Sequence, residues 1–299
     1  MLVFVHINKT AGSTVRYILR SSYGSRHCDV EPSLRKSEGS PFSTADLRRL
    51  RRIYPRLSSI AGHRVMGYVD LEEEGTEFSY LTILRDPVKL TASRFQYHVE
   101  HRKKKGLVFD EWIQREWLRD AQTKRIAGSS SVDDAIRVIQ RKQIFVGLTE
   151  RFDESIVLLK ALRARDLCID YQPVNVARRT VLAQELVSNT QTHRALIDAN
   201  QADLALYAHV KHELYPTFQR EFGLSLDDAV ADYQRHSRQK WNKRKLLASR
   251  LKRHGVYRPL LGLYRAAVAG KGGSGDARVT GDTEAMPPVD SRSTFGKRG

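Results

Sequence analysis

Small and hydroxyl-bearing residues follow the first apolar run of the chain and could bind a phosphate group. Residues 2–7 have the composition of a buried parallel strand. After residues 8–14 (NKTAGST), apolar residues recur at helical spacing. In a loop between a strand and a helix, backbone N–H groups converge on an anion. Lys9 adds an ammonium group beside three hydroxyls, although the Walker pattern is absent. The segment predicts a phosphate-binding loop; an ordinary solvated lysine in a turn is the alternative.

Arg85 ends a second strongly apolar run and offers another anion-binding position. It follows residues 78–84 and precedes Asp86 and a proline that starts a helix. A guanidinium group makes charge-assisted hydrogen bonds to phosphate, and Ser93 supplies a hydroxyl one to two helical turns later. An arginine that pairs with a neighbouring carboxylate, such as Asp86, is the structural alternative.

Strands and helices alternate along the chain and must position these two motifs. Strands are predicted at 2–7, 58–63, 78–84 and 144–147, and residues 21–57 are otherwise predicted to be loop with one helix. Helices are predicted at 44–54, from 87 towards 101, within 107–127, and at 132–142, 152–162 and 192–222. The alternation indicates an α/β fold in which helices flank a parallel sheet in three layers.

Composition limits the partners and the compartment. The 299 residues include 51 Lys and Arg against 34 Asp and Glu, a net charge of +17, which favours anionic partners such as nucleotides, nucleic acid, anionic lipid or acidic polysaccharide. Cys28 and Cys168 are too few for a disulfide framework, so a reducing compartment is expected. The sequence displays neither a secretory signal nor a membrane span, and a cytoplasmic location is the expectation.

Considered together, the two anion-binding motifs resemble those of sulfotransferases that use 3′-phosphoadenosine 5′-phosphosulfate (PAPS). The similarity is to the carbohydrate branch, which includes heparan sulfate 2-O-sulfotransferase and bacterial homologues. Residues 4–14 resemble its 5′-phosphosulfate loop, and residues 82–88 (TILRDPV) with Ser93 resemble its 3′-phosphate motif. Residues 61–63 (AGH) and 145–152 (FVGLTERF) are also similar, in the same order, within residues 3–222. Asn8 departs from the family, which usually has proline there.

The resemblance implies a P-loop-like sulfotransferase fold over residues 1–225, with PAPS as co-substrate and no metal. Lys9 would contact the sulfuryl and 5′-phosphate oxygens and stabilise the leaving phosphate. Arg85 and Ser93 would bind the 3′-phosphate. The remaining phosphate cradle would consist of Thr10, Ala11, Gly12, Ser13 and Thr14.

His63 is the candidate general base of this reaction. It follows Gly62 at the end of a predicted strand, matches the position of the family's proposed catalytic histidine, and belongs to the residue type that titrates near neutrality. A buried, hydrogen-bonded histidine is the alternative, and His6 is expected to be structural. The acceptor is expected to be a glycan or glycolipid. Candidate acceptor contacts are His98, Arg102, Arg178 and Arg179, although a solvated charge run is the more common explanation for basic residues such as Arg102.

The last part of the chain differs from the rest. Residues 226–269 predict a basic helical extension, and residues 270–299 predict a disordered tail. The basic stretch 233–254 either packs on the catalytic domain or makes a peripheral contact with anionic lipid. Two other functions compete with sulfotransfer: a nucleotide-dependent kinase, although the sequence lacks a Walker lysine and a clear Mg²⁺-binding carboxylate pair, and a basic nucleic-acid-binding protein, although it lacks a binding signature.

Overall fold

The fold is built around a five-stranded parallel sheet. The computed structural model describes residues 1–31, 40–71, 75–101, 106–171, 181–236 and 243–270. Within these residues the strands are ordered β2-β3-β1-β4-β5, and every neighbouring pair is parallel. The strands are β1 (Leu2–Val5), β2 (His27–Asp29), β3 (Ser59–Gly62), β4 (Ser79–Leu84) and β5 (Phe145–Leu148).

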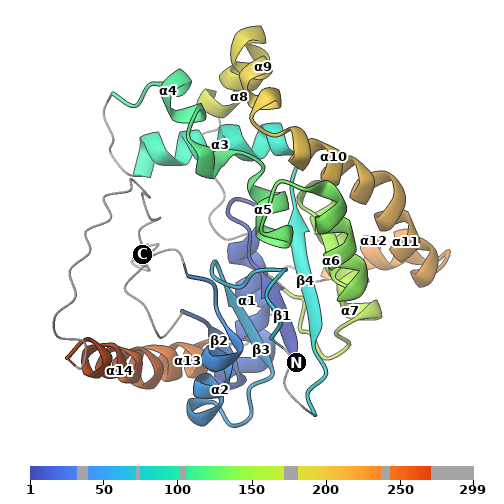
Figure 1. Ribbon diagram of the computed structural model, residues 1–299. Coiled ribbons are helices and arrows are strands. Elements are labelled where there is room, and N and C mark those ends of the chain that lie inside the picture. Colours follow the sequence, from blue (N-terminus) through green and yellow to red (C-terminus); the bar gives the residue numbers. More distant parts are fainter. Residues whose placement is uncertain (32–39, 72–74, 102–105, 172–180, 237–242, 271–299) are drawn as a thin grey trace, which may run out of the picture.

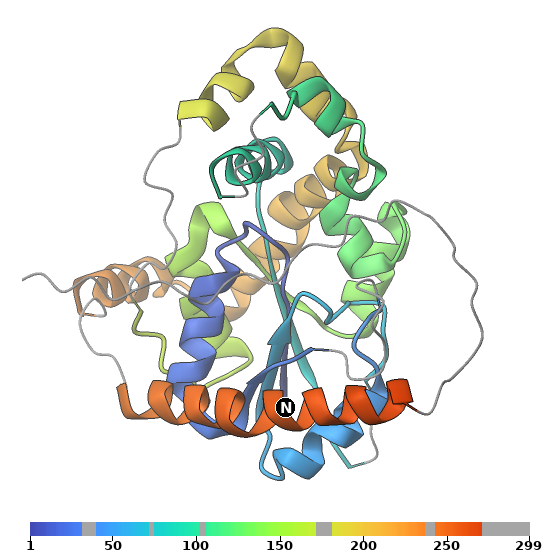
Figure 2. The ribbon, with the colours of Figure 1, turned by 90° about the vertical axis from the view of Figure 1, so that its left-hand side faces the viewer.

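Helices cover both faces of this sheet, as the alternating pattern predicts. In Figure 2 the sheet is seen close to edge-on, with α1 and α7 on one side and α5 and α6 on the other. The helices are α1 (Gly12–Tyr23), α2 (Thr44–Ile53), α3 (Pro87–His101), α4 (Phe109–Ile113), α5 (Ala121–Ala127), α6 (Val132–Arg141), α7 (Phe152–Leu162), α8 (Val181–Ser188), α9 (Thr190–Asp198), α10 (Gln201–His209), α11 (Tyr215–Phe222), α12 (Leu226–His236), α13 (Lys243–Lys252) and α14 (Arg258–Gly270). Short 3₁₀ turns lie at Gly24–Arg26, Glu116–Leu118 and Thr149–Arg151.

Strands β1, β4 and β5 are largely apolar because both of their faces are covered. All four residues of β1 and of β5 are buried. A main hydrophobic cluster surrounds the sheet, and a second cluster lies among α3, α4, α8 and α9. Local signals set the helix ends: Ser43 caps α2 by accepting a hydrogen bond from the Asp46 N–H, while Asp46 accepts one from the Ser43 N–H.

The edge strand β2 lies in a region where the sequence predicts only loop and one helix, and that prediction is wrong. The strand has three residues and no apolar period, which hides it from pattern analysis. Its charged residue, Asp29, is 2% exposed and is paired with Arg16 at 2.7 Å and with Arg20. These two cations lower the pKa of Asp29 well below its usual value. Tertiary ion pairing therefore compensates for the burial of a carboxylate.

Two long predicted helices are interrupted. Within 107–127 the chain forms α4, a 3₁₀ turn and α5, because Arg115 and Arg119 have extended backbones and Asp120 has a left-handed one (φ 48°). Within 192–222 a new helix begins after Asn200, and the π-helical turn Val210–Leu214 joins α10 to α11. Side chains from elsewhere in the chain stabilise these breaks: the Asp120 carboxylate, for example, accepts from the Ala202 N–H at 2.9 Å.

The strand order creates a switch point between β1 and β4. From β1 the chain continues to β2 at one edge of the sheet, whereas from β4 it continues to β5 at the opposite edge. Loops therefore diverge at the carboxyl ends of β1 and β4, and ligands of open α/β sheets bind at such a crevice. In Figure 1 this edge lies at the top of the sheet, below α3.

The C-terminal helices belong to the same packed body as the sheet. Leu226, Tyr233, Tyr257 and Leu261 all join the main hydrophobic cluster. A π-helical turn, Arg253–Tyr257, connects α13 to α14, so residues 243–270 form one uninterrupted helix. No described helix combines the length and apolar character needed to cross a membrane. The predicted tail, apart from Gly270, lies outside the described residues.

Candidate functional site

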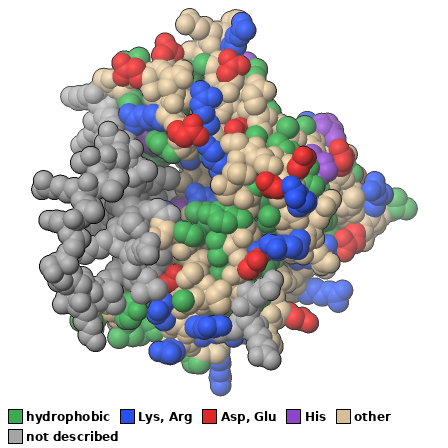
Figure 3. Space-filling view, in the orientation of Figure 1, with side chains coloured by type: hydrophobic (Ala, Val, Ile, Leu, Met, Phe, Trp, Pro, Cys, Tyr) green, Lys and Arg blue, Asp and Glu red, His purple; other side chains and the backbone are tan. Residues whose placement is uncertain are grey.

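Three neighbouring strands end beside one another and bring the principal candidate residues together. Val5, the last residue of β1, is in register with Gly62 of β3 and Thr82 of β4. The chain leaves these strands through residues 6–11, His63 and Arg85. Both predicted phosphate motifs and the predicted base therefore lie at one edge of the sheet. Figure 3, in the orientation of Figure 1, shows Lys or Arg side chains within a recess near the centre of the view.

The loop after β1 bends sharply before α1 begins. Lys9 (φ 68°) and Ala11 (φ 58°) both have left-handed backbones, an uncommon conformation for residues other than glycine. The buried Thr10 hydroxyl stabilises the bend by donating to the Ile7 carbonyl at 3.0 Å. The Thr14 N–H bonds the Ala11 carbonyl at 2.9 Å, which starts α1. Thr10 is thus a structural member of the cradle, and the helix start provides a favourable position for an anion.

Gly12 is required at the start of α1 because the ring of His6 occupies the adjacent space. A Cβ atom built on Gly12 would lie 1.9 Å from His6 Nε2. The His6 ring is 3% exposed and stacks on His63 with ring centroids 4.0 Å apart. Burial lowers the pKa of His6 well below its usual value, so its ring is neutral. His6 packs the loop against the end of β3, in agreement with the structural role that the sequence predicts.

Arg85 links the end of β4 to the predicted phosphate-binding loop. Its Nη1 donates to the Lys9 carbonyl at 3.0 Å. The side chain of Gln122 fixes the Arg85 backbone on both sides: Gln122 Oε1 accepts from its N–H at 3.0 Å, and Gln122 Nε2 donates to its carbonyl at 2.9 Å. Asp86, the carboxylate that could have paired with Arg85, instead accepts from the Lys89 N–H at the start of α3. The guanidinium is therefore held at the switch point.

The ammonium group of Lys9 lies over an aromatic ring. Its Nζ is 4.6 Å from the centre of the Tyr97 ring, which α3 contributes. Burial, followed by the positive charge of Arg85, lowers the pKa of Lys9. An anion bound between Lys9 and Arg85 would relieve this repulsion. Tyr97 carries no sequence signal of its own, because an aromatic residue at helical spacing usually belongs to a core.

His63 is oriented by the two neighbouring loops. Its Nδ1 lies 3.4 Å from the His6 carbonyl, and its own carbonyl accepts a hydrogen bond from Arg125. A proton on Nδ1 would point to that carbonyl and leave Nε2 as the acceptor. Burial and the charges of Arg125 and Arg16 lower the pKa of His63 to about 3. The ring is therefore neutral at pH 7 in the ligand-free protein.

The comparisons with known proteins leave this geometry without a family. No protein-family model matches the chain, and no curated protein matches it either. The chemistry of the site is therefore inferred from the residues at the three strand ends.

Arg94 and Arg125 add positive charge that sequence analysis missed. Arg94 follows Ser93 on α3 and is 8% exposed; its Nη1 has no hydrogen-bond partner among the described residues. Burial lowers the pKa of Arg94 to about 10. The pKa of Arg125 is also lowered to about 10, by burial and by the positive charge of Arg94. Asp203 on α10, 1% exposed, attracts the Arg94 charge and accepts from the Thr123 N–H at 2.7 Å. Charge in the sequence alone could not distinguish these buried arginines from solvated ones.

The remaining candidates fall into three groups. Ser93 is half-buried on α3, one residue before Arg94. His98 is 6% exposed: its Nδ1 accepts from Trp112 Nε1 at 3.3 Å, and its ring stacks on Trp117 at 5.7 Å. This packing gives His98 a structural role in the second cluster and leaves little of its ring for a substrate. Arg102, Arg178 and Arg179 lie outside the described residues.

Proposed function

We propose that this protein is a sulfotransferase that moves a sulfuryl group from PAPS to a hydroxyl of a carbohydrate acceptor, and that its sheet forms a P-loop-like sulfotransferase fold. The observation that carries the proposal is the 3.0 Å hydrogen bond from Arg85 Nη1 to the Lys9 carbonyl. It joins two basic motifs, distant in sequence, at the switch point of the sheet. PAPS carries phosphate groups on both sides of its ribose, so two neighbouring cationic positions suit it.

The residues of the loop suit the phosphosulfate end of the donor. The start of α1 offers backbone N–H groups and a favourable dipole, and Lys9 supplies a full positive charge. Lys9 is positioned to neutralise the negative charge that grows on the bridging oxygen as the sulfuryl group leaves. Arg85 and Ser93 are assigned to the 3′-phosphate, since a guanidinium and a hydroxyl both donate to phosphate oxygens. The donor supplies the sulfuryl group, and no metal is required by this arrangement of charges.

His63 is assigned the role of general base. In its neutral form Nε2 can accept the proton of the acceptor hydroxyl as the new S–O bond forms. A pKa of about 3 in the ligand-free protein makes the ring a weak base. Negative charge close to a histidine favours its protonated form, so a bound anionic donor raises this pKa and strengthens the base. The proposed order is therefore donor first and proton transfer second.

Ligand-induced stabilisation separates this proposal from its competitors. Adenosine 3′,5′-bisphosphate, at a hundred times its Kd, should raise the free energy of unfolding by about 2.7 kcal/mol. Adenosine 5′-monophosphate should stabilise the protein less, and Arg85→Ala should remove the difference between the two nucleotides. Stronger stabilisation by ATP–Mg²⁺ would identify a kinase, and stronger stabilisation by an oligonucleotide would identify a nucleic-acid-binding protein.

A transfer assay tests the reaction itself. The purified chain is incubated with PAPS and with a panel of neutral and acidic glycans, and each glycan is analysed by mass spectrometry for an added sulfate. Release of adenosine 3′,5′-bisphosphate without an acceptor measures background hydrolysis. Tight bisphosphate binding without transfer to any glycan of the panel, or to phenols and small alcohols tested in the same way, would contradict the assignment as an enzyme.

A further inference from the structure

The helix formed by residues 243–270 packs on the domain through one of its own faces. Lys245 Nζ donates to the Ser22 carbonyl at 2.7 Å, and Arg253 Nη2 contacts Glu31 at 2.9 Å. Tyr257 is 4% exposed, and its hydroxyl donates to the Glu31 carbonyl at 3.0 Å. These contacts recur along one side of the helix, so its orientation on the domain is fixed.

The exposed side of the same helix is unusually apolar. Nine large hydrophobic residues are exposed among the described parts of the chain, and five of them belong to this helix. Burial of a leucine side chain is favourable, so leucines that stay exposed to water are unfavourable. Exposed apolar surfaces of this kind often mark interaction sites. The five residues are Leu247, Leu251, Val256, Leu260 and Leu263, between 43% and 69% exposed.

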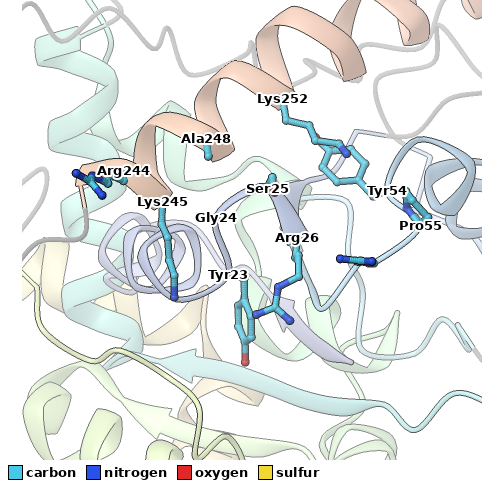
Figure 4. A pocket seen from close by; sticks show the side chains of 11 residues that line it. Tyr23, Gly24, Ser25, Arg26, Tyr54, Pro55, Arg244, Lys245, Ala248 and Lys252 are labelled. Atoms are coloured by element: carbon cyan, nitrogen blue, oxygen red, sulfur yellow. The ribbon is translucent and has the colours of Figure 1, made fainter.

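Positive charge surrounds this apolar surface. Residues 243–270 contain eight Lys and Arg and no Asp or Glu. A pocket of about 480 Å³ opens beside α13, as Figure 4 shows, between that helix, the turn after α1 and the residues after α2. None of the lining residues that the structure describes is a carboxylate. Its five cationic lining residues are Arg26, Arg56, Arg244, Lys245 and Lys252.

We propose that this face docks on an anionic membrane surface: the exposed leucines enter the interfacial layer, and the cationic pocket receives a lipid headgroup phosphate. An amphipathic helix that combines leucines with lysines and arginines has this affinity. Two copies of the chain would bring sixteen like charges together, which disfavours pairing through this face. A nucleic acid would satisfy the pocket but leave the leucines in water.

The orientation of such docking leaves the candidate active site accessible. The pocket is lined by Gly24–Arg26 and by Pro55 and Arg56, which precede β2 and β3. It therefore lies at the amino ends of the strands, whereas Lys9, His63 and Arg85 lie at the carboxyl ends. Figures 1 and 2 show α13 and α14 across the end of the sheet opposite to α3. The inference does not depend on sulfotransfer.

Vesicle sedimentation with the full chain tests the inference. Vesicles of phosphatidylcholine with about one third phosphatidylserine should bind the protein at least tenfold more tightly than phosphatidylcholine alone, given about 1 kcal/mol for each basic residue near the surface. Leu247→Asn/Leu251→Asn should weaken binding at least tenfold. Arg56→Gln/Arg244→Gln, which removes two exposed pocket cations, should weaken it about thirtyfold.

A matched control removes the same charge elsewhere. Arg137 and Arg141 on α6 have side chains 73% and 61% exposed, so Arg137→Gln/Arg141→Gln should stay within about twofold of the wild type. Circular dichroism verifies that each variant is folded. Failure of the wild type to bind the anionic vesicles, or equal weakening by the control, would overturn the inference. Unchanged vesicle binding by Leu247→Asn/Leu251→Asn would also overturn it. The same holds if a DNA duplex binds as tightly as the vesicles, or if the protein forms a dimer that this variant dissociates.

Discussion

At the scale of single residues, Lys9 and Arg85 must be considered as one unit. Arg85 bonds the carbonyl of Lys9, and its charge contributes to the lowered pKa of the Lys9 ammonium. Two half-buried cations that repel each other are stabilised when an anion binds between them. This repulsion supports the proposed binding of an anionic donor, in which the two side chains have different roles.

Lys9→Ala should reduce kcat by about 10²- to 10³-fold, because the charge that Lys9 neutralises is largest in the transition state. Binding of adenosine 3′,5′-bisphosphate, measured by calorimetry, should weaken far less. Lys89→Ala, which removes an exposed lysine on α3, is the matched control and should leave both quantities unchanged. Wild-type turnover by Lys9→Ala would exclude the proposed role.

His63→Ala should lower turnover at least a hundredfold, because a general base typically contributes that much, while donor binding is retained. His212→Ala, at an exposed position on the π-helical turn, serves as control. Turnover is measured with saturating donor. A large loss of donor binding by His63→Ala would indicate a positioning function instead.

The protonation of His63 can be followed directly by NMR of its ring nitrogens. In the ligand-free protein the ring should remain neutral from pH 7 down to pH 5, because burial and Arg125 lower its pKa to about 3. Arg125→Gln removes one of the cations that depress the pKa and should move the titration upwards. A midpoint near the ordinary value of 6.5 in the wild type would contradict the burial of this ring.

At the scale of elements, the loop between β1 and α1 depends on close packing as much as on hydrogen bonds. The helix can start at Gly12 only because no side chain competes there with the ring of His6. The same ring stacks on His63, so the start of α1 and the end of β3 are connected through the packing of these two rings. The phosphate cradle and the candidate base therefore share one packing contact.

Gly12→Ala should destabilise the protein by about 1–3 kcal/mol, measured by urea unfolding, because its Cβ would overlap His6 Nε2. His6→Ala/Gly12→Ala should recover part of the loss relative to the sum of the two single variants. Gly255→Ala is the control, since nothing lies within 4 Å of its added Cβ. Equal effects of Gly12→Ala and Gly255→Ala would contradict the close approach.

At the scale of the whole molecule, buried ionisable groups couple the fold to pH. His6 and His27 are 3% and 1% exposed, and burial lowers the pKa of both. The unfolded chain takes up protons on these rings as the pH falls through 6.5, whereas the folded protein takes up fewer at the same pH. Their contribution to stability is thus full above pH 6.5 and falls as the pH decreases.

The free energy of unfolding should therefore drop between pH 7.5 and pH 5.5, because His6, His27 and His63 all have lowered pKa values; the upper limit is about 1.36 kcal/mol for each ring. Urea unfolding at the two pH values measures the change. His27→Asn, which keeps a polar group near Ser59, should make the drop smaller. Constant or increasing stability towards pH 5.5 would be inconsistent with neutral buried rings.

The sequence by itself determined the local order of the site. An apolar strand followed by small residues, and a second strand followed by Arg85 and Pro87, fix where each motif lies because strand and loop composition are local properties. The α/β class with a parallel sheet follows from the same alternation. The cap of α2 is also local, since Ser43 bonds with Asp46, three residues later.

Only the tertiary structure decided which motifs meet. The order β2-β3-β1-β4-β5 makes β1 the neighbour of both β3 and β4, and this pairing rests on contacts between residues more than fifty positions apart. Packing added the buried guanidinium of Arg94 and the ring of Tyr97, whose roles come from neighbours remote in sequence. It also lowered the pKa of His63, because burial and charge depend on the whole fold rather than on the residue type.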